Sequence, residues 1–482
     1  MKDYNFTRPI DTDEFSDATS LLKNFKEGKT TSLDVVEKSL RSIADNHERL
    51  NAMTQLFAKE ALEEAKKSTE KKQTKKIGKL EGIPISLKES IGVEGEEVTG
   101  GSIRMPVQIA KADALVVQRL KKEGAIIIAR TNTPEFSFGH ETRSPRFGVT
   151  NHPYLEDYIP GGSSGGESAL IASGGSVIGI GTDVGGSIRY PAHCCGLVGF
   201  KPSGTAVSKK GVFPFVERED WYLNDWLAVG PITHTVRDAK LVYEVIADKA
   251  LDDNLVSNNL DNAELLISTD FDSEIRNETI KEVLIHAKQS LLNEGMTPRN
   301  LEINNIGKIH WNFGKMMIKA MKLGLKNWLR NDKDVGISVF VESLRRVIGE
   351  KTVSKEIYSV LLASKFLEPS DKDLEKLIQF YKQEKEELHK KIGRKGVLLL
   401  PTSGDIALKH NQTIQIDMSP LVPNIFSPMI FTNVMNLPSI TIPAWKHRDR
   451  KTGLPTSVML CCLPNSESLL FEAASKLEKV LN

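Results

Sequence analysis

The first candidate for chemistry is a lysine in an apolar strand. In the segment G-I-P-I-S-L-K-E over residues 82–89, strand alternation places the three aliphatic side chains on one face and Ser86 with Lys88 on the other. Loss of solvation favours the neutral form of a buried lysine, which is the form that accepts a proton. Lys88 is therefore a candidate general base. Taken alone, however, this segment fits better with a lysine at a strand end that reaches solvent or pairs with Glu89.

A glycine-rich segment, P-G-G-S-S-G-G, follows at residues 160–166. Its four glycines permit positive φ angles and bring backbone N–H groups and the hydroxyls of Ser163 and Ser164 close to a ligand. A flexible Gly/Ser linker is the alternative interpretation. A phosphate-binding loop is disfavoured, because Glu167 stands where such a loop has a lysine.

A second glycine-rich segment, G-T-D-V-G-G-S-I-R-Y-P, covers residues 181–191. Ser187 directly follows two glycines, so its hydroxyl is exposed beside a row of backbone N–H groups, as the oxyanion of an acyl-transfer reaction requires. Ser187 is therefore the candidate nucleophile, with an ordinary tight turn as the alternative. The segment is not a G-x-S-x-G nucleophile elbow, because Ile188 and Arg189 follow the serine.

Histidines give little support to a conventional Ser-His-Asp triad. His193, His152 and His140 are the nearest to Ser187 in sequence, and none has a recognisable His-Asp arrangement, so we interpret all three as structural. No cluster has the spacing of metal ligands, and we predict neither a metal nor a cofactor. The four cysteines form two adjacent pairs, 194–195 and 461–462, which predicts buried reduced thiols and, weakly, a cytoplasmic protein.

Composition limits the partners of the chain. Its 482 residues contain 64 Lys plus Arg against 63 Asp plus Glu, so there is no electrostatic argument for nucleic acid as a partner. The first twenty residues lack the apolar stretch of a signal peptide, and no run approaches the roughly 18 to 20 apolar residues that span a bilayer.

The pattern of elements predicts an α/β fold. From Leu80 onward, short apolar runs alternate with helical stretches such as 112–123, as expected for a largely buried mixed sheet between helices. Before it, residues 32–67 predict two helices with Ser32 as the N-cap, and the charged run 66–79 predicts a helix end and a loop. We predict one domain with four parts: an N-terminal helical arm (1–79), a catalytic core (80–250), a helical insertion or cap (252–395), and C-terminal strands and a helix that complete the core (396–482).

Together, the three segments resemble the amidase signature family. The resemblance rests on a lysine after G-I-P-x-S-x, then G-G-S-S-G-G, then G-x-D-x-G-G-S-I-R-x-P, with 75 residues from Lys88 to Ser163 and 24 from Ser163 to Ser187. It continues in T-S-L-D-V-V-E-K-S-L near the start and in F-T-N-V-M-N-L-P-S-I-T-I-P-A near the end. Three motifs in the family's order and spacing favour the catalytic interpretation of each segment over its alternative.

The resemblance implies an α/β/α fold and a Ser-Ser-Lys triad that cleaves amides. Ser187 would attack the amide carbonyl to form an acyl-enzyme, while Ser163 passes its proton to neutral Lys88. The family also holds its first relay serine after a cis peptide bond, here 162–163. A non-catalytic scaffold on this fold is disfavoured because all three triad residues are present.

The same resemblance assigns further residues around the triad. Backbone N–H groups of Val184, Gly185, Gly186 and Ser187 would form the oxyanion hole. It also implies that the main chain of Ser137 faces the substrate. The residues expected to support the site are Ser164, through hydrogen bonds, and Asp183 and Arg189, as structural partners of the glycine-rich turns.

Within the family, the segments 162–191 and K-K-G-V-F-P-F are most similar to fatty acid amide hydrolases, particularly the second type. Cys194 departs from that pattern, where an aromatic residue is common, and so does the lack of an N-terminal membrane span. One alternative is the A subunit of a glutamyl-tRNA amidotransferase, which acts with partner subunits and usually has a small residue at the place of Glu167. Another is a hydrolase of small or cyclic amides.

The segment 309–329 bears on the substrate. On a helix, Lys315, Lys319, Lys322 and Lys326 share one face, and methionine, leucine and tryptophan cover most of the rest. Such a helix touches lipid, walls an acyl channel, or is an ordinary amphipathic cap. The expected partner is therefore a small-molecule amide, with lipid amides included, whereas peripheral membrane contact and a homodimer are left open.

Overall fold

The computed structural model describes residues 17–71, 77–214, 222–252, 260–328, 339–347, 349–350, 352–417 and 424–482. Three parts of the predictions lie outside these ranges. They are residues 1–16, which bear on secretion, residues 72–76 of the charged run, and Leu329 at the end of the predicted amphipathic helix. No helix within the described ranges is both long enough and apolar enough to cross a bilayer.

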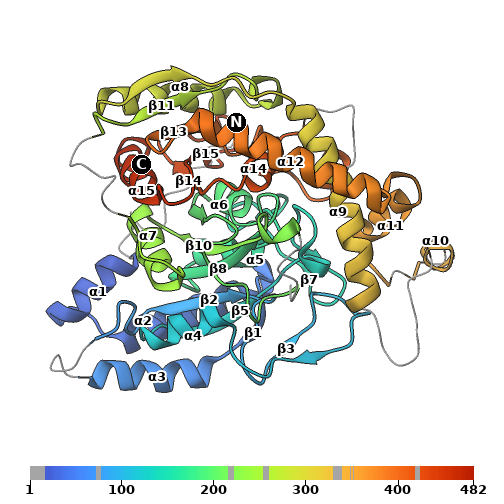
Figure 1. Ribbon diagram of the computed structural model, residues 1–482. Coiled ribbons are helices and arrows are strands. Elements are labelled where there is room, and N and C mark those ends of the chain that lie inside the picture. The colour runs from blue at the N-terminus through green and yellow to red at the C-terminus, as the bar shows by residue number, and fades with distance from the viewer. Residues whose placement is uncertain are drawn as a thin grey trace.

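Eleven strands form one mixed sheet through the middle of the molecule (Figure 1). Their order is β1-β5-β2-β8-β10-β9-β14-β15-β13-β11-β12. Pairing is parallel among β5, β2 and β8 and among β13, β11 and β12, and antiparallel elsewhere. The strands are β1 (Met53–Leu56), β2 (Pro84–Lys88), β5 (Ile126–Thr131), β8 (Ile178–Asp183), β9 (Val198–Lys201), β10 (Ala228–Thr233), β11 (Glu264–Ile267), β12 (Thr297–Asn300), β13 (Gly396–Pro401), β14 (Ser439–Ala444) and β15 (Thr456–Cys461).

The short apolar runs of the sequence form the central strands. Every residue of β2, β5, β8, β13, β14 and β15 is buried, because helices cover both faces of the sheet. This confirms the predicted α/β fold with a mixed sheet between helices. Two short hairpins lie outside the main sheet: β3 (Glu97–Val98) with β4 (Gln108–Ile109), and β6 (Arg143–Ser144) with β7 (Gly148–Val149).

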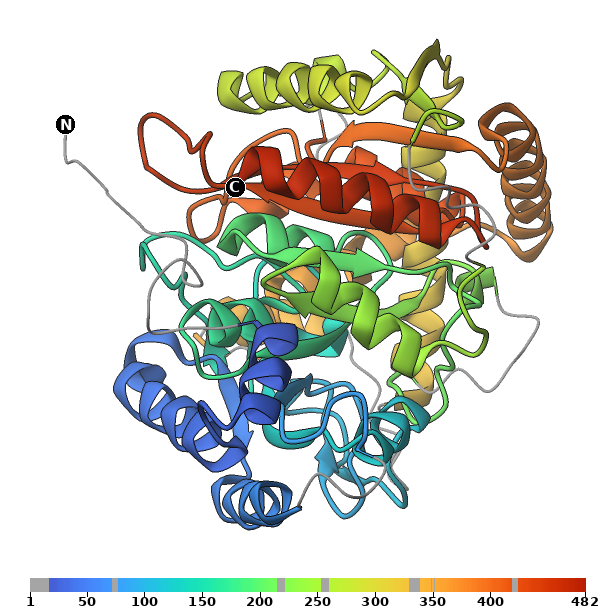
Figure 2. The same cartoon turned by 90° about the vertical axis from the view of Figure 1, so that its left-hand side faces the viewer.

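Helices divide between the two faces. One apolar cluster joins a face of the sheet to α1, α4, α7, α8 and α15, and Figure 2 looks onto this face, with α7 and α15 in front of the strands. These helices are α1 (Ala18–Glu27), α4 (Leu115–Lys122), α7 (Val236–Ile246), α8 (Glu278–Asn293) and α15 (Glu467–Leu481). The helices associated with the other face are α2 (Ser32–Leu50), α3 (Ala58–Glu70), α5 (Gly165–Ala172), α6 (Arg189–Cys195), α9 (Ile306–Trp328), α12 (Asp371–Ile392) and α14 (Ser427–Val434).

The two helices predicted over residues 32–67 are α2 and α3, but the first begins differently from the prediction. Thr31, not Ser32, is the N-cap: its hydroxyl accepts from the N–H of Asp34, whose carboxylate accepts from the N–H of Thr31 at 2.8 Å. Ser32 is instead the first helical residue, and its hydroxyl donates to the carbonyl of Gly82 at 2.8 Å. Between the helices, β1 pairs with β5 at the edge of the sheet.

The sequence predicted a helical insertion over residues 252–395, but the segment also contains strands. It contributes β11 and β12, which extend the main sheet beyond β13 by parallel pairing, with α8 between them. The reason is that the short apolar run at β11 continues the buried sheet of the core. The rest of the segment is helical, with α10 (Val339–Val347) and α11 (Lys355–Leu367) following α9, and α12 closing it; α13 (Thr413–Asp417) comes after β13.

Candidate active site

Lys88 is the last residue of β2, and its side chain is completely buried. Its Nζ lies 2.6 Å from Ser163 Oγ and 2.9 Å from Thr182 Oγ1. Burial lowers the pKa of Lys88 to about 7, against the opposing effect of nearby carboxylates such as Asp183. Near neutral pH, a substantial fraction of this lysine is therefore uncharged and able to accept a proton.

Ser163 stands in a tightly packed turn before α5. The bond between Gly162 and Ser163 is a cis peptide, which confirms the feature expected from the resemblance. A side chain at Gly162 would place its Cβ 2.7 Å from the carbonyl carbon of His140, and one at Gly165 would lie 2.3 Å from the hydroxyl of Thr142. The glycines therefore allow the turn to pack closely against its neighbours, and the alternative of a flexible linker is wrong.

Ser187 lies in the turn between β8 and α6 and is half-buried. Its carbonyl accepts from the N–H of Ser164 at 3.1 Å, which ties the two glycine-rich turns together. Ser187, Ser163 and Ser137 all line one cavity of about 260 Å³. Among the hydrogen bonds of the described residues, none joins the hydroxyls of Ser187 and Ser163, and the hydrogen bond among the three candidate triad side chains joins Lys88 to Ser163.

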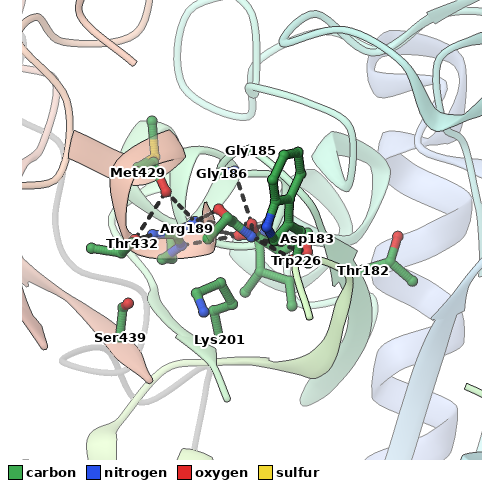
Figure 3. A network of polar contacts seen from close by, with 12 residues as sticks. Thr182, Asp183, Gly185, Gly186, Arg189, Lys201, Trp226, Met429, Thr432 and Ser439 are labelled. Atoms are coloured by element: carbon green, nitrogen blue, oxygen red, sulfur yellow. Dashed lines mark hydrogen bonds and ion pairs between the residues drawn. The ribbon is translucent and has the colours of Figure 1, made fainter. Parts of the chain in front are cut away.

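Asp183 and Arg189 form a network of polar contacts with the turn that carries Gly185 and Gly186 (Figure 3). The Asp183 carboxylate accepts from the N–H groups of Gly186 at 2.8 Å and Ile188 at 3.0 Å, and from Arg189 Nε at 3.0 Å. Both side chains of this ion pair are fully buried. Burial alone would raise the pKa of Asp183, but the Arg189 guanidinium holds it well below the usual range. The turn is therefore fixed by a permanently charged pair, and neither side chain lines the cavity.

Four backbone N–H groups were expected to face the substrate oxygen. Val184, Gly185 and Ser187 line the cavity, whereas the N–H of Gly186 is bonded to Asp183. A Cβ on Gly185 would be in van der Waals contact with the ring of Phe313 at 3.4 Å, so this residue faces the side chains of α9. Three of the four expected donors thus belong to residues on the cavity wall.

Helix α9 forms much of that wall. The buried Met316 anchors this helix, while Lys319 and Lys322 form ion pairs with Glu368 at the end of α11. The cavity is therefore enclosed mainly by apolar side chains from α9, from α11 and from the loop around Ser137. The apolar lining residues are Phe136, Phe138, Val184, Phe213, Pro214, Leu223, Leu227, Trp311, Phe313, Met317, Ile318, Ala320, Met321, Trp328, Val360, Leu367, Ile414 and Ile430.

Two polar residues beside Lys88 were not found from the sequence. Thr182 bonds to the lysine, and parallel pairing of Leu87 with Ile180 is what aligns the two strand ends. Glu167 is completely buried in α5, accepts hydrogen bonds from Ser86 and Thr131, and has its pKa raised by burial to about 8. Thr182 could have been found from the sequence if the pairing of the two apolar strands β2 and β8 had been predicted. No motif indicates Glu167.

Of the three histidines nearest to Ser187 in sequence, two have structural hydrogen bonds and one lines the cavity. His193 bonds to Ser457 at 2.7 Å, and His152 bonds to the carbonyl of Cys194 at 2.9 Å, as structural residues do. His140 lines the cavity, and its Nε2 lies 3.1 Å from the carbonyl of Gly185. All four cysteines are buried free thiols, which confirms the prediction.

The sequence matches the family model described as amidase over residues 34–471. The chain belongs to the amidase family. It is therefore an enzyme that acts on amide C–N bonds.

Relatives of this amidase include glutamyl-tRNA(Gln) amidotransferase A subunits. The one from Endomicrobium trichonymphae is 36% identical over 228 residues, which are 47% of this chain and 46% of the relative. The one from Fusobacterium nucleatum subsp. nucleatum is 28% identical over 491 residues and 96% of each chain. The solved structure of a fatty acid amide hydrolase has the same fold, with a TM-score of 0.78 and 21% identity over 99% of this amidase and 87% of that chain.

Proposed function

We propose that this amidase hydrolyses amides of apolar carboxylic acids through an acyl-enzyme on Ser187. The observation that carries the proposal is the cavity: its two reactive serines, Ser163 and Ser187, open into a space enclosed mostly by aromatic and aliphatic side chains. Behind Ser163 stands Lys88, buried and readily deprotonated near neutral pH. The proposed nucleophile and relay thus line the cavity in which an apolar substrate would bind, with the proposed base hydrogen-bonded to the relay.

In the first step, Ser187 Oγ attacks the amide carbonyl carbon. Its proton passes to Ser163, whose own proton passes to the neutral Lys88. The negative charge that develops on the carbonyl oxygen is stabilised by N–H groups of the Ser187 turn, each typically contributing about 3 kcal/mol in the transition state. The same relay then protonates the nitrogen of the leaving amine as the C–N bond breaks. Water, deprotonated by the same groups, hydrolyses the acyl-enzyme and restores Ser187.

A fatty acid amide is the finer form of this proposal. Its support is the wall of α9, which offers methionine, phenylalanine and tryptophan side chains to the cavity, as an acyl chain would require. On α10 and α11, Phe340 is 70% exposed and Phe366 is 84% exposed. We propose these side chains as the peripheral contact with the membrane that would carry such a substrate, in a cytoplasmic enzyme. Vesicle sedimentation that is the same for the native protein and a Phe340→Glu, Phe366→Glu variant would exclude the contact.

A second candidate is an amidotransferase A subunit that takes ammonia from glutamine with partner subunits. The relatives favour it, because both of those described above are glutamyl-tRNA(Gln) amidotransferase subunits. The apolar cavity wall speaks for a less polar substrate than glutamine. A hydrolase of small or cyclic amides would share the chemistry and differ in the length of chain accepted. The homodimer stays a prediction.

The test is turnover by the purified chain alone. Aminocoumarin amides from acetyl to palmitoyl are offered alongside glutamine, with release of the fluorescent amine and of ammonia as the two readouts. We expect hydrolysis of the acyl amides to increase with chain length and glutamine to remain uncleaved. The proposal would be overturned in favour of the second candidate if the purified chain alone cleaved none of these compounds and hydrolysed glutamine only after amidotransferase partner subunits were added.

A further inference from the structure

Glu356 is an unusual carboxylate in the wall of the cavity. It is the second residue of α11, its side chain is only 7% exposed, and it lines the same cavity as Ser163 and Ser187. Its Cγ would lie 3.3 Å from a Cβ placed on Gly139, so it packs against the loop that follows Ser137. The side chain thus belongs to the surroundings of the substrate although it is far from the triad in sequence.

Both oxygens of Glu356 are buried without a hydrogen bond, and among the carboxylates that the structure describes this holds for Glu356 alone. Its buried neighbours are satisfied. Glu135 accepts from Ser102 Oγ and from the N–H of Ser354, both at 2.6 Å, and Glu141 accepts from Arg143 at 2.8 Å. The nearest cation to Glu356 is Lys355, whose Nζ lies 3.8 Å away and is also shared with Glu141.

A buried carboxylate without hydrogen-bond donors is costly, and proteins rarely keep one unless a ligand supplies the donors. Burial raises the pKa of Glu356, although the nearby N–H of its own backbone and the Lys355 ammonium act to lower it. A protonated amine has three N–H donors and one positive charge, so it would both satisfy the oxygens and stabilise their negative charge. Most of the other residues that line the cavity are apolar, which suits the remainder of the same molecule.

We propose that Glu356 binds an ammonium group of the substrate, so that this amidase prefers amides that combine an apolar part with a positively charged amine. The inference rests on the proposed function, because it takes the cavity beside Ser187 to be the substrate site. Glu356 would determine specificity and takes no part in the proton transfers. The amide bond is broken by the triad as before.

The test separates binding from turnover. Ser187→Ala protein is titrated by calorimetry with two series of nitroanilides. In the first series, ω-aminoacyl anilides of increasing length are compared with acyl anilides of equal length. In the second series, anilides with an aminomethyl group on the ring are compared with anilides with a methyl group there. We expect at least one ammonium compound to bind about ten- to a hundredfold more tightly than its neutral match, the range for a hydrogen bond to a charged group.

Adding Glu356→Gln to the Ser187→Ala protein should abolish that preference. The matched control is Glu375→Gln, which removes one exposed carboxylate from α12 and should leave the preference intact. The melting temperature of the Glu356→Gln protein should fall little, because the carboxylate has no hydrogen bond within the protein to lose and only a 3.8 Å ion pair with Lys355. A marked fall would assign Glu356 a structural role and overturn the proposal.

Other outcomes also overturn it. They are equal binding of every charged and neutral pair, a preference that survives Glu356→Gln, and tighter binding of carboxylate-bearing analogues, which would point to Lys315 on the same cavity wall. Hydrolysis of the neutral anilides by native enzyme decides the proposed function separately. If these are cleaved while no ammonium preference exists, the proposed function stands and only the inference about Glu356 fails.

Discussion

Burial favours the neutral form of Lys88 near neutral pH, as the proposed role of base requires. Three carboxylates, Asp183, Glu167 and Glu89, act to keep it charged, and desolvation outweighs them. Glu167 opposes the lowering of the Lys88 pKa less than a charged carboxylate would. The reason is that burial raises the pKa of Glu167 to about 8 and leaves it largely protonated at pH 7. Two buried groups of opposite type thus both tend to the neutral form.

The pH dependence of catalysis should report the protonation of Lys88. Its pKa is lowered to about 7, so the proton-accepting form is lost as pH falls below that value. We expect kcat/KM to rise with pH through about 7 and then level off. Lys88→Ala should remove this acid limb and lower kcat/KM by roughly 10²- to 10⁴-fold, the usual contribution of a general base.

Lys201 provides a matched control for that measurement. It is also completely buried, with a pKa lowered to about 7, but its Nζ bonds to the carbonyl of Pro202 at 3.0 Å and contacts no triad residue. The acid limb should persist in Lys201→Met. A limb that persists in Lys88→Ala and disappears in Lys201→Met would remove Lys88 from the role of base.

At the scale of elements, the turn between β8 and α6 depends on one buried ion pair. Asp183→Asn should lower the free energy of unfolding by about 3 to 5 kcal/mol, because it leaves the Arg189 guanidinium buried without its counter-charge. Urea denaturation measures the change. Glu278→Gln, which breaks an exposed i,i+3 pair with Lys281, should cost less than about 1 kcal/mol. Equal losses in the two variants would contradict the role given to Asp183.

Helix α9 should set the length of the acyl chain. Gly314 lines the cavity and has open space where a side chain would be, so Gly314→Leu should narrow the cavity and shift the preferred acyl amide to a shorter chain. Gly307 lies on the same helix with the same open space but not on the cavity wall. Gly307→Leu should therefore leave the chain-length preference of kcat/KM unaltered, and a similar shift in both variants would argue against α9 as the acyl wall.

Elements were predicted from the sequence where one local signal dominates. Continuous apolar runs identify β2, β5 and β8, because strands buried on both faces need no polar alternation. The pattern did not identify β10, whose sequence A-V-G-P-I-T contains a glycine and a proline that are usually unfavourable inside a sheet. The N-cap of α2 was misplaced by one residue because adjacent Thr31 and Ser32 are both good caps.

At the scale of the whole molecule, the site joins distant parts of the chain. Neighbouring strands β2 and β8 align Lys88 with the Ser187 turn, while α9 and α11 supply the opposite residues of the cavity. The three motifs were recognisable because their residue types, order and spacing in this chain match those of the family. Glu356 and His140 belong to no such motif, and Thr182 stands at the unspecified position of G-x-D in one of them. Only the packing of the folded chain brings these three residues to the cavity.

The identity of the nucleophile is the central claim, and mass spectrometry of the intact protein tests it most directly. A fluorophosphonate should add one adduct to the native enzyme and none to Ser187→Ala, which should also lose amide turnover while remaining folded. Ser208→Ala, in a loop segment outside the cavity, is the matched control and should be labelled like the native enzyme. An adduct of equal yield on Ser187→Ala, or amide turnover that survives the substitution, would contradict the account.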